Sequence, residues 1–320
     1  MQVDSVQSLL NAIIIDTSVQ MVYNNVVMGK HGFYPFEWRD IMKKIVTVQD
    51  ISCFGKCSLT AALPIISAMG IETAVIPTAV LSTHTGGFKE YTFHDLTDDI
   101  PQIAGHWKKL GLKFNAIYTG YLGSKRQVRI ISDFFDEFRT DGNIMVVDPV
   151  LGDGGKFYAG FDRDFVAEMK KLCARADYII PNMTEASYLL DIPYAENYDE
   201  AYVKEVLRRL AEIGCKIPVI TGVHYDSEKQ GAAAYDSVND EFYFSFGENL
   251  PHIVHGTGDI FASVFTGAAV LGKSLQRSLD IAVNYTLDCI KATLPEIEEM
   301  WYGTDFELAL DKLIGYVKED

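Results

Sequence analysis

From residue 45 onward, short apolar runs of strand length alternate with stretches that carry apolar residues at helical spacing. Six runs are nearly continuous in apolar residues, as in strands covered on both faces: 45–48, 73–81, 116–122, 144–150, 178–181 and 218–223. Helical patterns connect them at about 58–69, 95–110, 125–139, 163–175, 183–190 and 199–213. Right-handed crossovers between such units predict a doubly wound, mostly parallel α/β sheet with helices on both faces.

One hairpin and three helical patterns complete the sequence after the sixth run. Segments 231–235 and 241–246 flank a turn-rich stretch and predict an antiparallel hairpin at the sheet edge. Helical spacing then continues through 258–271, 275–293 and 304–317. No internal repeat or linker-like tract interrupts the pattern, so residues 42–320 are expected to form one domain.

The first 41 residues do not share this alternation. Their apolar clusters are short, and a second start-like sequence follows at Met42. We therefore expect residues 1–41 to be an N-terminal appendage that is either poorly ordered or not part of the native protein.

Charge and cysteine content limit the kinds of partner and compartment. A formal net charge of −16, without a cluster of Lys or Arg, argues against a nucleic-acid partner. No apolar run reaches the ~20 residues of a membrane span, so no membrane partner is expected. The cysteines are odd in number and form no CxxC pair, which favours a reducing cytoplasmic setting over a disulfide framework; they are Cys53, Cys57, Cys173, Cys215 and Cys289.

The motif Gly256-Thr257-Gly258-Asp259 stands directly before a helical pattern. Amides at a helix start have no partner within the helix and bind phosphate, and glycine lets that phosphate approach the backbone closely. A carboxylate beside such a turn suits phosphoryl transfer to an alcohol, because the hydroxyl proton needs an acceptor. The helix start is expected to hold the pKa of Asp259 low, and an Asp in a first turn is also an ordinary complement to the helix dipole.

Polar residues follow each predicted strand, and ligands of open α/β sheets bind at the carboxyl ends of the strands. The candidates there are Asp50, Ser52, Thr85, Tyr121, Asp148, Asn182, Glu185, Thr221 and Gly222. Several also have purely structural interpretations. Asn182 with Glu185 resembles a capping box, His84 can satisfy a turn, and Tyr121 can belong to the core. Six polar strand ends on one edge, together with the glycine turn, favour a site for a small molecule.

From Met42 to about residue 293, the sequence resembles the pyridoxal kinases of the ribokinase-like superfamily. The motifs occur in the family's order: Ser-Thr-His-Thr (82–85), Thr-Gly-Tyr-Leu-Gly (119–123), Asp-Pro-Val-Leu-Gly-Asp (148–153), Pro-Asn-x-x-Glu (181–185) and Gly-Thr-Gly-Asp (256–259). The resemblance implies ATP-dependent phosphorylation of the 5′-hydroxymethyl group of pyridoxal, pyridoxamine or pyridoxine. It also implies B6 salvage to pyridoxal 5′-phosphate and a homodimer.

The resemblance also implies roles for the candidate residues. Asp259 would be the base, with Gly256, Thr257 and Gly258 as the anion-binding turn. The substrate would contact Asp50, Ser52, Thr85 and Tyr121, and ATP would contact Asn182, Glu185, Thr221 and Gly222. Mg²⁺ would be held by Asp148 and, through water, by Glu185, in keeping with the preference of Mg²⁺ for carboxylates and water.

Two positions depart from the pyridoxal kinase pattern. Asp50 replaces a Ser, and Asp50 with Ser52 resembles the hydroxymethylpyrimidine kinases of the same superfamily instead. Ile180 replaces a Thr found in some pyridoxal kinases, at a position that bears on a monovalent-cation site. Hydroxymethylpyrimidine or phosphomethylpyrimidine kinase activity in thiamin synthesis is therefore the first alternative, and a non-catalytic B6-binding regulatory protein is the second. A nucleotide-dependent oxidoreductase is disfavoured, because no GxGxxG follows the first strand.

Overall fold

The structure is a computed structural model that describes residues 42–250 and 255–319. The chain divides into two units, Met1–Met42 and Lys43–Asp320. The expectation that residues 1–41 are an appendage falls outside the described residues and stays a prediction.

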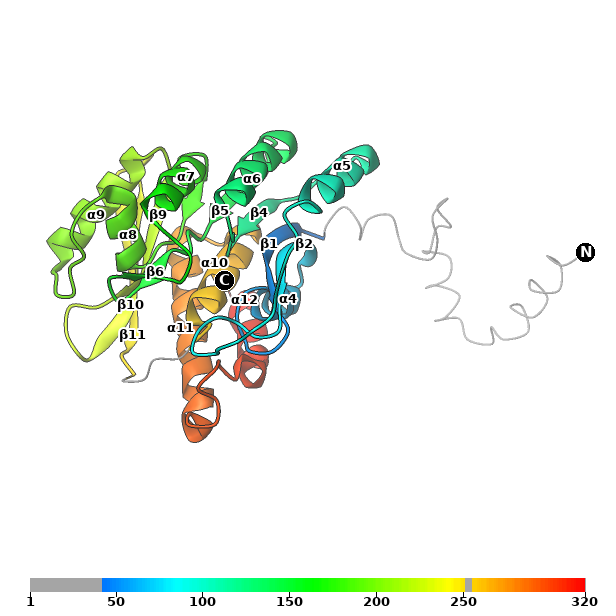
Figure 1. Cartoon of the computed structure of the whole chain (residues 1–320). Coiled ribbons are helices and arrows are strands. Elements are labelled where there is room, and N and C mark those ends of the chain that lie inside the picture. Colours follow the sequence, from blue (N-terminus) through cyan, green and yellow to red (C-terminus); the bar gives the residue numbers. More distant parts are fainter. Residues whose placement is uncertain (1–41, 251–254, 320) are drawn as a thin grey trace, which may run out of the picture. The chain divides into compact units, whose positions relative to one another are not determined.

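A nine-stranded sheet lies at the centre of the described unit, in the order β11-β10-β9-β8-β5-β4-β1-β2-β3 (Figure 1). Six strands run parallel, as the alternating pattern predicts: β1 (Lys44–Ser52), β2 (Glu72–Leu81), β4 (Ala116–Thr119), β5 (Ile144–Val147), β8 (Tyr178–Ile179) and β9 (Ile217–Val223). The predicted edge hairpin is confirmed as antiparallel β10 (Lys229–Asp236) and β11 (Glu241–Glu248).

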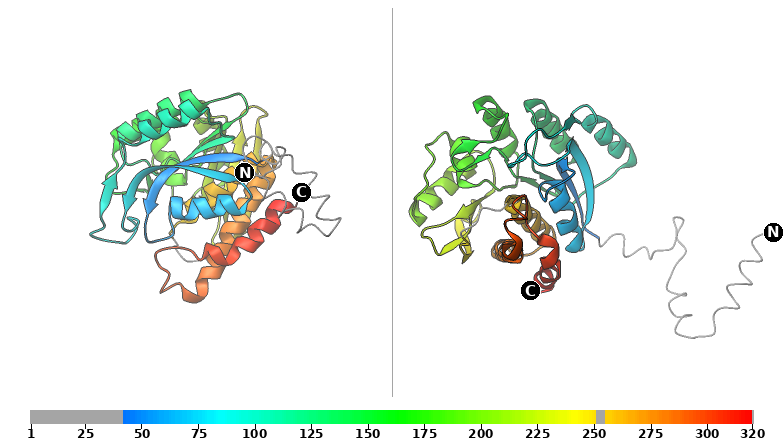
Figure 2. Two further views of the ribbon diagram at one scale, coloured as in Figure 1. Left: turned by 90° about the vertical axis from the view of Figure 1, so that its right-hand side faces the viewer. Right: turned by 60° about the horizontal axis from the view of Figure 1, so that its bottom comes forward.

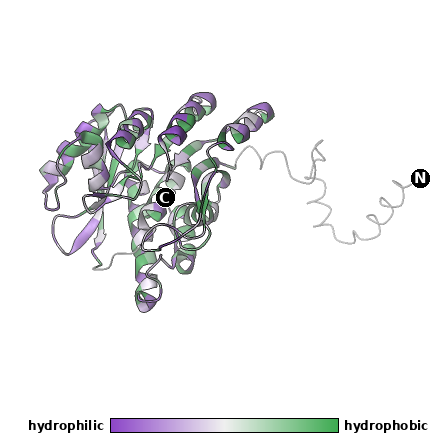
Figure 3. Cartoon of the chain, viewed as in Figure 1, coloured by the Kyte–Doolittle hydropathy of each residue, from purple (hydrophilic) through white to green (hydrophobic). Residues whose placement is uncertain are grey.

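Helices cover both faces of this sheet (Figure 2). One apolar core lies under α5 (Ile100–Leu110), α6 (Lys125–Phe138), α7 (Arg163–Cys173), α8 (Met183–Leu190) and α9 (Glu200–Glu212). The second lies under α4 (Leu59–Ala68), α10 (Thr257–Val270), α11 (Leu275–Thr293) and α12 (Leu310–Lys318). Adjacent residues of β1 point to opposite faces, so Ile45 enters the second core and Val46 the first. Outer helices such as α6 carry both hydrophilic and hydrophobic residues (Figure 3).

Several predicted boundaries are wrong, for local reasons. The expected helix 95–110 begins only at Ile100, and the chain before it contains the antiparallel edge strand β3 (Phe93–Asp95). All three residues of β3 are exposed, so they carry no apolar signal. Strand β4 ends at Thr119 rather than Leu122. The next residue is Gly120, where a Cβ would lie only 2.9 Å from Gln49 Cδ, so a larger residue would crowd the Gln49 side chain.

Short elements that the pattern did not predict lie near the strand ends and late in the chain. Among the described residues, β6 (Gly152–Asp153) and β7 (Lys156–Phe157) pair as a small separate hairpin. The expected helix 304–317 divides into the 3₁₀ turn η2 (Phe306–Ala309) and α12. Another 3₁₀ turn, η1 (Leu294–Glu296), follows α11 directly.

The strand order locates the crevice that parallel sheets use for ligands. Strand β1 pairs with β2 on one side and β4 on the other, so the chain winds in opposite directions from this point. Ligands of doubly wound sheets bind outside the carboxyl ends of the strands at such a point. Residues at the ends of β1 and β4 are therefore positioned at the crevice.

Candidate active site

Helix α10 begins at a glycine turn that is open to a ligand. Its N-cap, Gly256, has a φ of 84°, and a Cβ there would lie 2.2 Å from the backbone oxygen of Lys56. Only glycine fits that backbone and that contact. Gly258, in the first turn, is exposed, and a Cβ on it would meet none of the described residues within 4 Å. The described residues thus leave space at Gly258 in the first turn of α10, as close approach of an anion to this backbone requires.

Asp259 lies in the same first turn and is half-buried. Burial, with a smaller contribution from the charge of Asp50, raises the pKa of Asp259 to about 7 against the opposing effect of a hydrogen bond from the backbone amide of Ser58. The expectation that the helix start holds this pKa low is therefore wrong, because desolvation outweighs the helix dipole. A carboxylate that titrates near neutral pH is well matched to accept a proton.

Asp50 lies inside β1, not after it, at an irregularity of the β1 and β2 pairing between Gln49 and Ile51. Such irregularities re-aim side chains. Asp50 is 4% exposed, accepts a hydrogen bond from Ser52 Oγ at 3.0 Å, and is also bonded by the Ser58 side chain. Burial raises the pKa of Asp50 despite these two donors.

Tyr121 stands at the end of β4, beside Asp50. Burial, and after it the charge of Asp50, raises the pKa of Tyr121 to about 12. Its ring lies 5.7 Å from that of Phe161 and packs partly against the first core. The structure thus brings Asp50, Ser52 and Tyr121 together, while Tyr121 also contributes to packing.

Thr85 is exposed in the loop after β2, and its neighbour His84 fixes that loop. The backbone amide of Gly86 donates to Nδ1 of His84 at 3.0 Å, so Nε2 carries the proton and donates to the carbonyl of Tyr302 at 2.7 Å. The rings of His84 and His255 lie 5.4 Å apart, which places the Thr85 loop beside the residue preceding the glycine turn. The turn-forming interpretation of His84 is confirmed.

Asn182 and Glu185 form the capping box that their spacing predicts at the start of α8. Glu185 accepts from the backbone amides of Leu151 and Asn182 at 2.9 Å, and the Asn182 side chain donates to the carbonyl of Gly152 at 2.9 Å. Burial nevertheless raises the pKa of Glu185 to about 8. The pKa of Asp148 is raised by burial, then by the charges of Glu185 and Asp259.

These carboxylates suit Mg²⁺ held jointly with a nucleotide. The residues that the structure describes contain no group of three or more His, Cys, Asp or Glu able to hold a metal. Mg²⁺ in nucleotide sites needs only one or two carboxylates, because phosphates and water complete its shell. The raised pKa values of Asp148 and Glu185 indicate acidic groups that a cation would favour in their ionised form.

Thr221 and Gly222 lie near the end of β9, beside Asn182. Thr221 forms a parallel bridge with Asn182, and its amide donates to the carbonyl of Pro181 at 3.0 Å. Gly222 has a φ of 68°, and its carbonyl lies 3.1 Å from Nδ1 of His224. The structure therefore gathers the predicted nucleotide residues at one edge of the sheet.

Two residues of the loop after β1 were not predicted to belong to the site. Ser58 bonds both Asp50 and Asp259, and Lys56 lies against Gly256. A serine before a helical pattern signals only an N-cap, and the ionic partners of Lys56 lie some 250 residues further on, at Asp305 and Glu307. Local spacing carries no signal for either contact.

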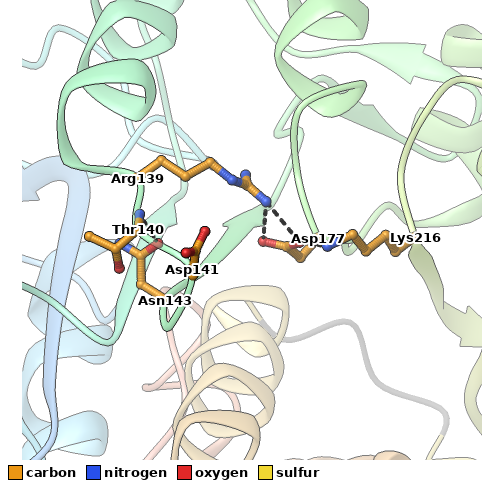
Figure 4. Close-up of a pocket in the computed structure, with 6 residues that line it drawn as sticks. All are labelled: Arg139, Thr140, Asp141, Asn143, Asp177 and Lys216. Carbon is orange, nitrogen blue, oxygen red and sulfur yellow. Dashed lines mark hydrogen bonds and ion pairs between the residues drawn. The ribbon is translucent and has the colours of Figure 1, made fainter.

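A polar pocket lies at the opposite edge of the sheet, before the parallel strands begin (Figure 4). Asp177 is bonded there by Arg139 Nη2 at 2.9 Å and 3.0 Å, by Lys216 Nζ at 2.6 Å and by the amide of Met145 at 2.9 Å. Both cations are thus engaged by one buried carboxylate. We interpret this pocket as a structural cluster that joins the starts of β5, β8 and β9.

Within the described ranges, no helix is long and apolar enough to cross a membrane. All five cysteines are free thiols.

The fold and the site define a small-molecule kinase of the ribokinase-like fold, in which a half-buried Asp follows a glycine turn near the switch point of the sheet. The chain belongs to the Phosphomethylpyrimidine kinase family, which matches residues 53–301. The chain is similar to pyridoxal kinases as well as to phosphomethylpyrimidine kinases.

Solved structures and sequence relatives both show this similarity. A putative phosphomethylpyrimidine kinase from Bacteroides thetaiotaomicron, crystallised with pyridoxal, is 43% identical, with a TM-score of 0.81 over 85% of this chain and 96% of that one. Pyridoxal kinase from Lactobacillus plantarum is 32% identical, with a TM-score of 0.79 over 85% and 97%. The pyridoxine/pyridoxal/pyridoxamine kinase of Bordetella avium is 25% identical, and the alignment covers 81% of this chain and 88% of that protein. The hydroxymethylpyrimidine/phosphomethylpyrimidine kinase of Haemophilus influenzae is also 25% identical and covers 79% and 93%.

Proposed function

We propose that this kinase transfers the γ-phosphoryl group of ATP to the 5′-hydroxymethyl group of a B6 vitamer. The observation that carries the proposal is the half-buried carboxylate of Asp259 directly after the exposed Gly258 in the first turn of α10. That arrangement offers donors for a phosphoryl group and an acceptor for the hydroxyl proton within one helical turn. The pyridoxal bound to the 43% identical relative supports a B6 vitamer as the acceptor.

In this proposal, Asp259 accepts the proton of the hydroxymethyl group as its oxygen bonds to phosphorus. The amides at the start of α10 bind the transferred group, and their positive end stabilises the negative charge on its oxygens. The transition state is loose, so the proton leaves late and a moderately basic carboxylate is sufficient. Asp50, Ser52, Thr85 and Tyr121 would orient the acceptor ring.

Asn182, Thr221 and Gly222 would contact the nucleotide, and Asp148 and Glu185 would hold Mg²⁺, Glu185 through water. Bound Mg²⁺ would neutralise the phosphate charge. The two oxygens of Glu185 already accept backbone amides, so a bridging water is the natural contact. Ile180 offers no side-chain oxygen, so a monovalent cation bound near this strand end would need other oxygen ligands.

Hydroxymethylpyrimidine kinase activity is the second candidate, because the buried carboxylate of Asp50 would favour an acceptor ring that carries an amine. The Haemophilus influenzae relative supports this alternative, and it is as similar in sequence as the Bordetella avium relative that supports B6 phosphorylation, since both are 25% identical. A regulatory protein without turnover is disfavoured, since Asp259, Asp148 and Glu185 are all retained and brought together.

We further infer a role in B6 salvage, in the cytoplasm, as a homodimer. Five free thiols fit a reducing compartment, and salvage follows from phosphorylating a preformed vitamer. Sedimentation of the purified protein tests the dimer.

A coupled ADP-release assay with pyridoxal, pyridoxamine, pyridoxine and hydroxymethylpyrimidine tests the function. We expect turnover on the B6 vitamers and a kcat roughly 10²–10⁴-fold lower for Asp259→Asn, with ATP affinity little changed. Turnover on hydroxymethylpyrimidine alone would establish the second candidate. Near wild-type turnover of Asp259→Asn would rule out this Asp as the base.

A further inference from the structure

The segment from Leu294 to Ala309, here called the C-terminal strap, contacts the loop 53–58 after β1. Lys56 Nζ lies 2.7 Å from Asp305 Oδ1 and 2.8 Å from Glu307 Oε2. A Cβ on Gly303 would lie 2.8 Å from Lys56 Cβ, so backbone and side chain are closely packed there. Lys56 is only about one-fifth exposed, at 21% of its side-chain surface. Its ion pairs are therefore less screened than those of an ordinary surface lysine.

The strap is itself fixed to α11. The Thr293 hydroxyl donates to the carbonyl of Cys289 at 2.8 Å and accepts from the amide of Asp305 at 2.8 Å. The hydroxyl of Tyr285, which is fully buried, donates to the carbonyl of Phe306 at 3.0 Å. Asp305 thus offers Lys56 a partner whose backbone is held in place.

A second set of contacts joins the strap to the loop after β1 and to the loop after β2. The ring of Tyr302 lies 4.8 Å from that of Phe54, and the ring of Trp301 lies 4.6 Å from that of Phe88. The carbonyl of Tyr302 accepts the hydrogen bond of His84. The strap therefore touches the loop after β1 and the loop that carries Thr85.

Residues 56–58 continue from the strap to the reacting groups. The carbonyl of Lys56 lies against Gly256, the sulfur of Cys57 would lie 3.5 Å from a Cβ on Gly256, and the amide of Ser58 bonds Asp259. Burial raises the pKa of the Cys57 thiol, and the charges of Asp259 and Asp50 raise it further. Moving Lys56 would therefore move the Gly256 turn and the donor to Asp259 together.

We propose that Lys56 is a positioning residue: anchored on the C-terminal strap through Asp305 and Glu307, it fixes loop 53–58 against the Gly256 turn and Asp259. The inference rests on the proposed kinase function, and it adds a residue that touches neither substrate. Its effect falls on kcat, since a displacement on the order of 1 Å at reacting groups costs up to about 100-fold in rate.

Lys56→Met and Lys56→Arg test the proposal, compared with the wild-type full chain. We expect Lys56→Met to lower kcat by roughly 10–100-fold while KM for ATP changes by less than about threefold. Lys56→Arg should recover most of kcat, because a guanidinium can still pair with two carboxylates. A kcat of Lys56→Met within about twofold of wild type, or no recovery with Arg, would overturn the proposal.

Lys312→Met is the matched control. Lys312 Nζ lies 2.7 Å from Asp288, so this variant also removes an ion pair between C-terminal elements, but one that does not touch loop 53–58. It should keep wild-type kcat. An equal loss of kcat in both variants would show that the effect is general destabilisation.

Hydrogen exchange of the amides 53–58, measured without substrate, separates this proposal from the proposed function. Exchange should be at least about tenfold faster in Lys56→Met and unchanged in Lys312→Met. Unchanged exchange in a folded Lys56→Met protein would overturn the positioning role even if kcat falls. If wild type phosphorylates none of the four acceptors, the proposed function fails, while the exchange result still decides whether Lys56 anchors the loop.

Asp305→Asn serves where Lys56→Met does not fold, because it keeps the lysine and removes one charge. It should accelerate exchange in the same segment, and wild-type exchange would contradict the proposal. In the double variant Lys56→Met/Asp305→Asn, kcat should fall no further than in Lys56→Met alone, since both changes break one contact. A further multiplicative loss would show that Asp305 acts by another route.

Discussion

The backbone amide of Ser58 donates a hydrogen bond to the carboxylate of Asp259, and the side chain of the same serine bonds Asp50. Ser58 achieves this with a φ of 52° and a ψ of −131°, a backbone conformation that non-glycine residues rarely adopt. Strain of this kind persists where the surroundings fix the conformation, and it is often found at functional sites. The strain here lies between the two carboxylates of the site.

Replacing Ser58 separates backbone strain from hydrogen bonding. Ser58→Gly and Ser58→Ala both lose the hydroxyl and keep the amide bond to Asp259, but only Ser58→Gly relieves the strain. We expect Ser58→Gly to be more stable than Ser58→Ala by about 1–2 kcal/mol in urea unfolding. Equal stability of the two variants would mean that the backbone here is not strained.

The raised pKa of Asp259 predicts how stability depends on pH. In the folded protein this pKa is raised from 3.8 to about 7, so ionising the group costs the folded state more than the unfolded state. The stability that the protonated group contributes is complete below about pH 4 and is lost as the pH rises through about 7. Asp259→Asn remains neutral throughout, so it should gain stability relative to wild type between about pH 4 and 8, by a few kcal/mol at most.

Unfolding free energies of wild type and Asp259→Asn at about pH 4, 6 and 8 check this prediction. Asp148 and Glu185 also have raised pKa values and are retained in both proteins, but the charge of Asp259 contributes to the shift of Asp148, so the difference reports Asp259 together with its effect on Asp148. A difference that stays constant over this range would show that Asp259 is solvated like a surface carboxylate.

Gly258 offers a way to perturb nucleotide binding without perturbing the fold. Within residues 42–250 and 255–319, a Cβ built on Gly258 meets nothing within 4 Å, so Gly258→Val should fold normally, yet its side chain would occupy the space where phosphate approaches. We expect KM for ATP to rise by roughly tenfold or more and the melting temperature to stay within a few degrees of wild type. A change confined to the KM of the acceptor would contradict the anion-binding role of this turn.

The sequence predicted the parallel sheet, the edge hairpin and the capping box at Asn182, because these depend on local periodicity and spacing. It did not predict β3, whose three residues are all exposed. It also placed Asp50 after β1, whereas an irregularity in the β1 pairing keeps Asp50 inside the strand and buries it. Periodicity cannot show such an irregularity, because it shifts the pairing without changing residue types.

The pKa of Asp259 could not be predicted from the sequence for a different reason. The helix dipole at Asp259 is a local property, and it predicted a low pKa. Burial and the charge of Asp50 are tertiary properties, and they reverse the direction of the shift. The pairing of Lys56 with Asp305 likewise joins residues 249 positions apart.

Removal of residues 1–41 should leave folding and kinase activity intact. The family match begins at residue 53 and the first strand at Lys44, so the sheet and all proposed site residues lie in the remaining chain. We expect the protein starting at Met42 to keep its melting temperature within a few degrees and kcat within about twofold. An insoluble or clearly less stable truncated protein would show that the N-terminal residues contribute to the folded domain.

Asp50→Ser tests whether the buried carboxylate selects the acceptor. Asp50 is 4% exposed, and burial raises its pKa, so a donor or positive charge on the acceptor ring would stabilise its ionised form. A charge-assisted hydrogen bond contributes about 1.5–3 kcal/mol, or roughly 10–100-fold in relative kcat/KM. The variant should therefore lose kcat/KM for pyridoxamine and hydroxymethylpyrimidine more than for pyridoxal.

Ser52→Ala is the matched control for Asp50→Ser. It removes the 3.0 Å hydrogen bond to Asp50 but keeps the carboxylate, so the preference between amine and aldehyde acceptors should remain close to that of wild type. The measurement is kcat/KM for each acceptor in all three proteins under one buffer and salt condition. Equal losses on every acceptor in Asp50→Ser would mean that Asp50 only shapes the end of β1, because a side chain that does not contact the acceptor cannot discriminate between its substituents.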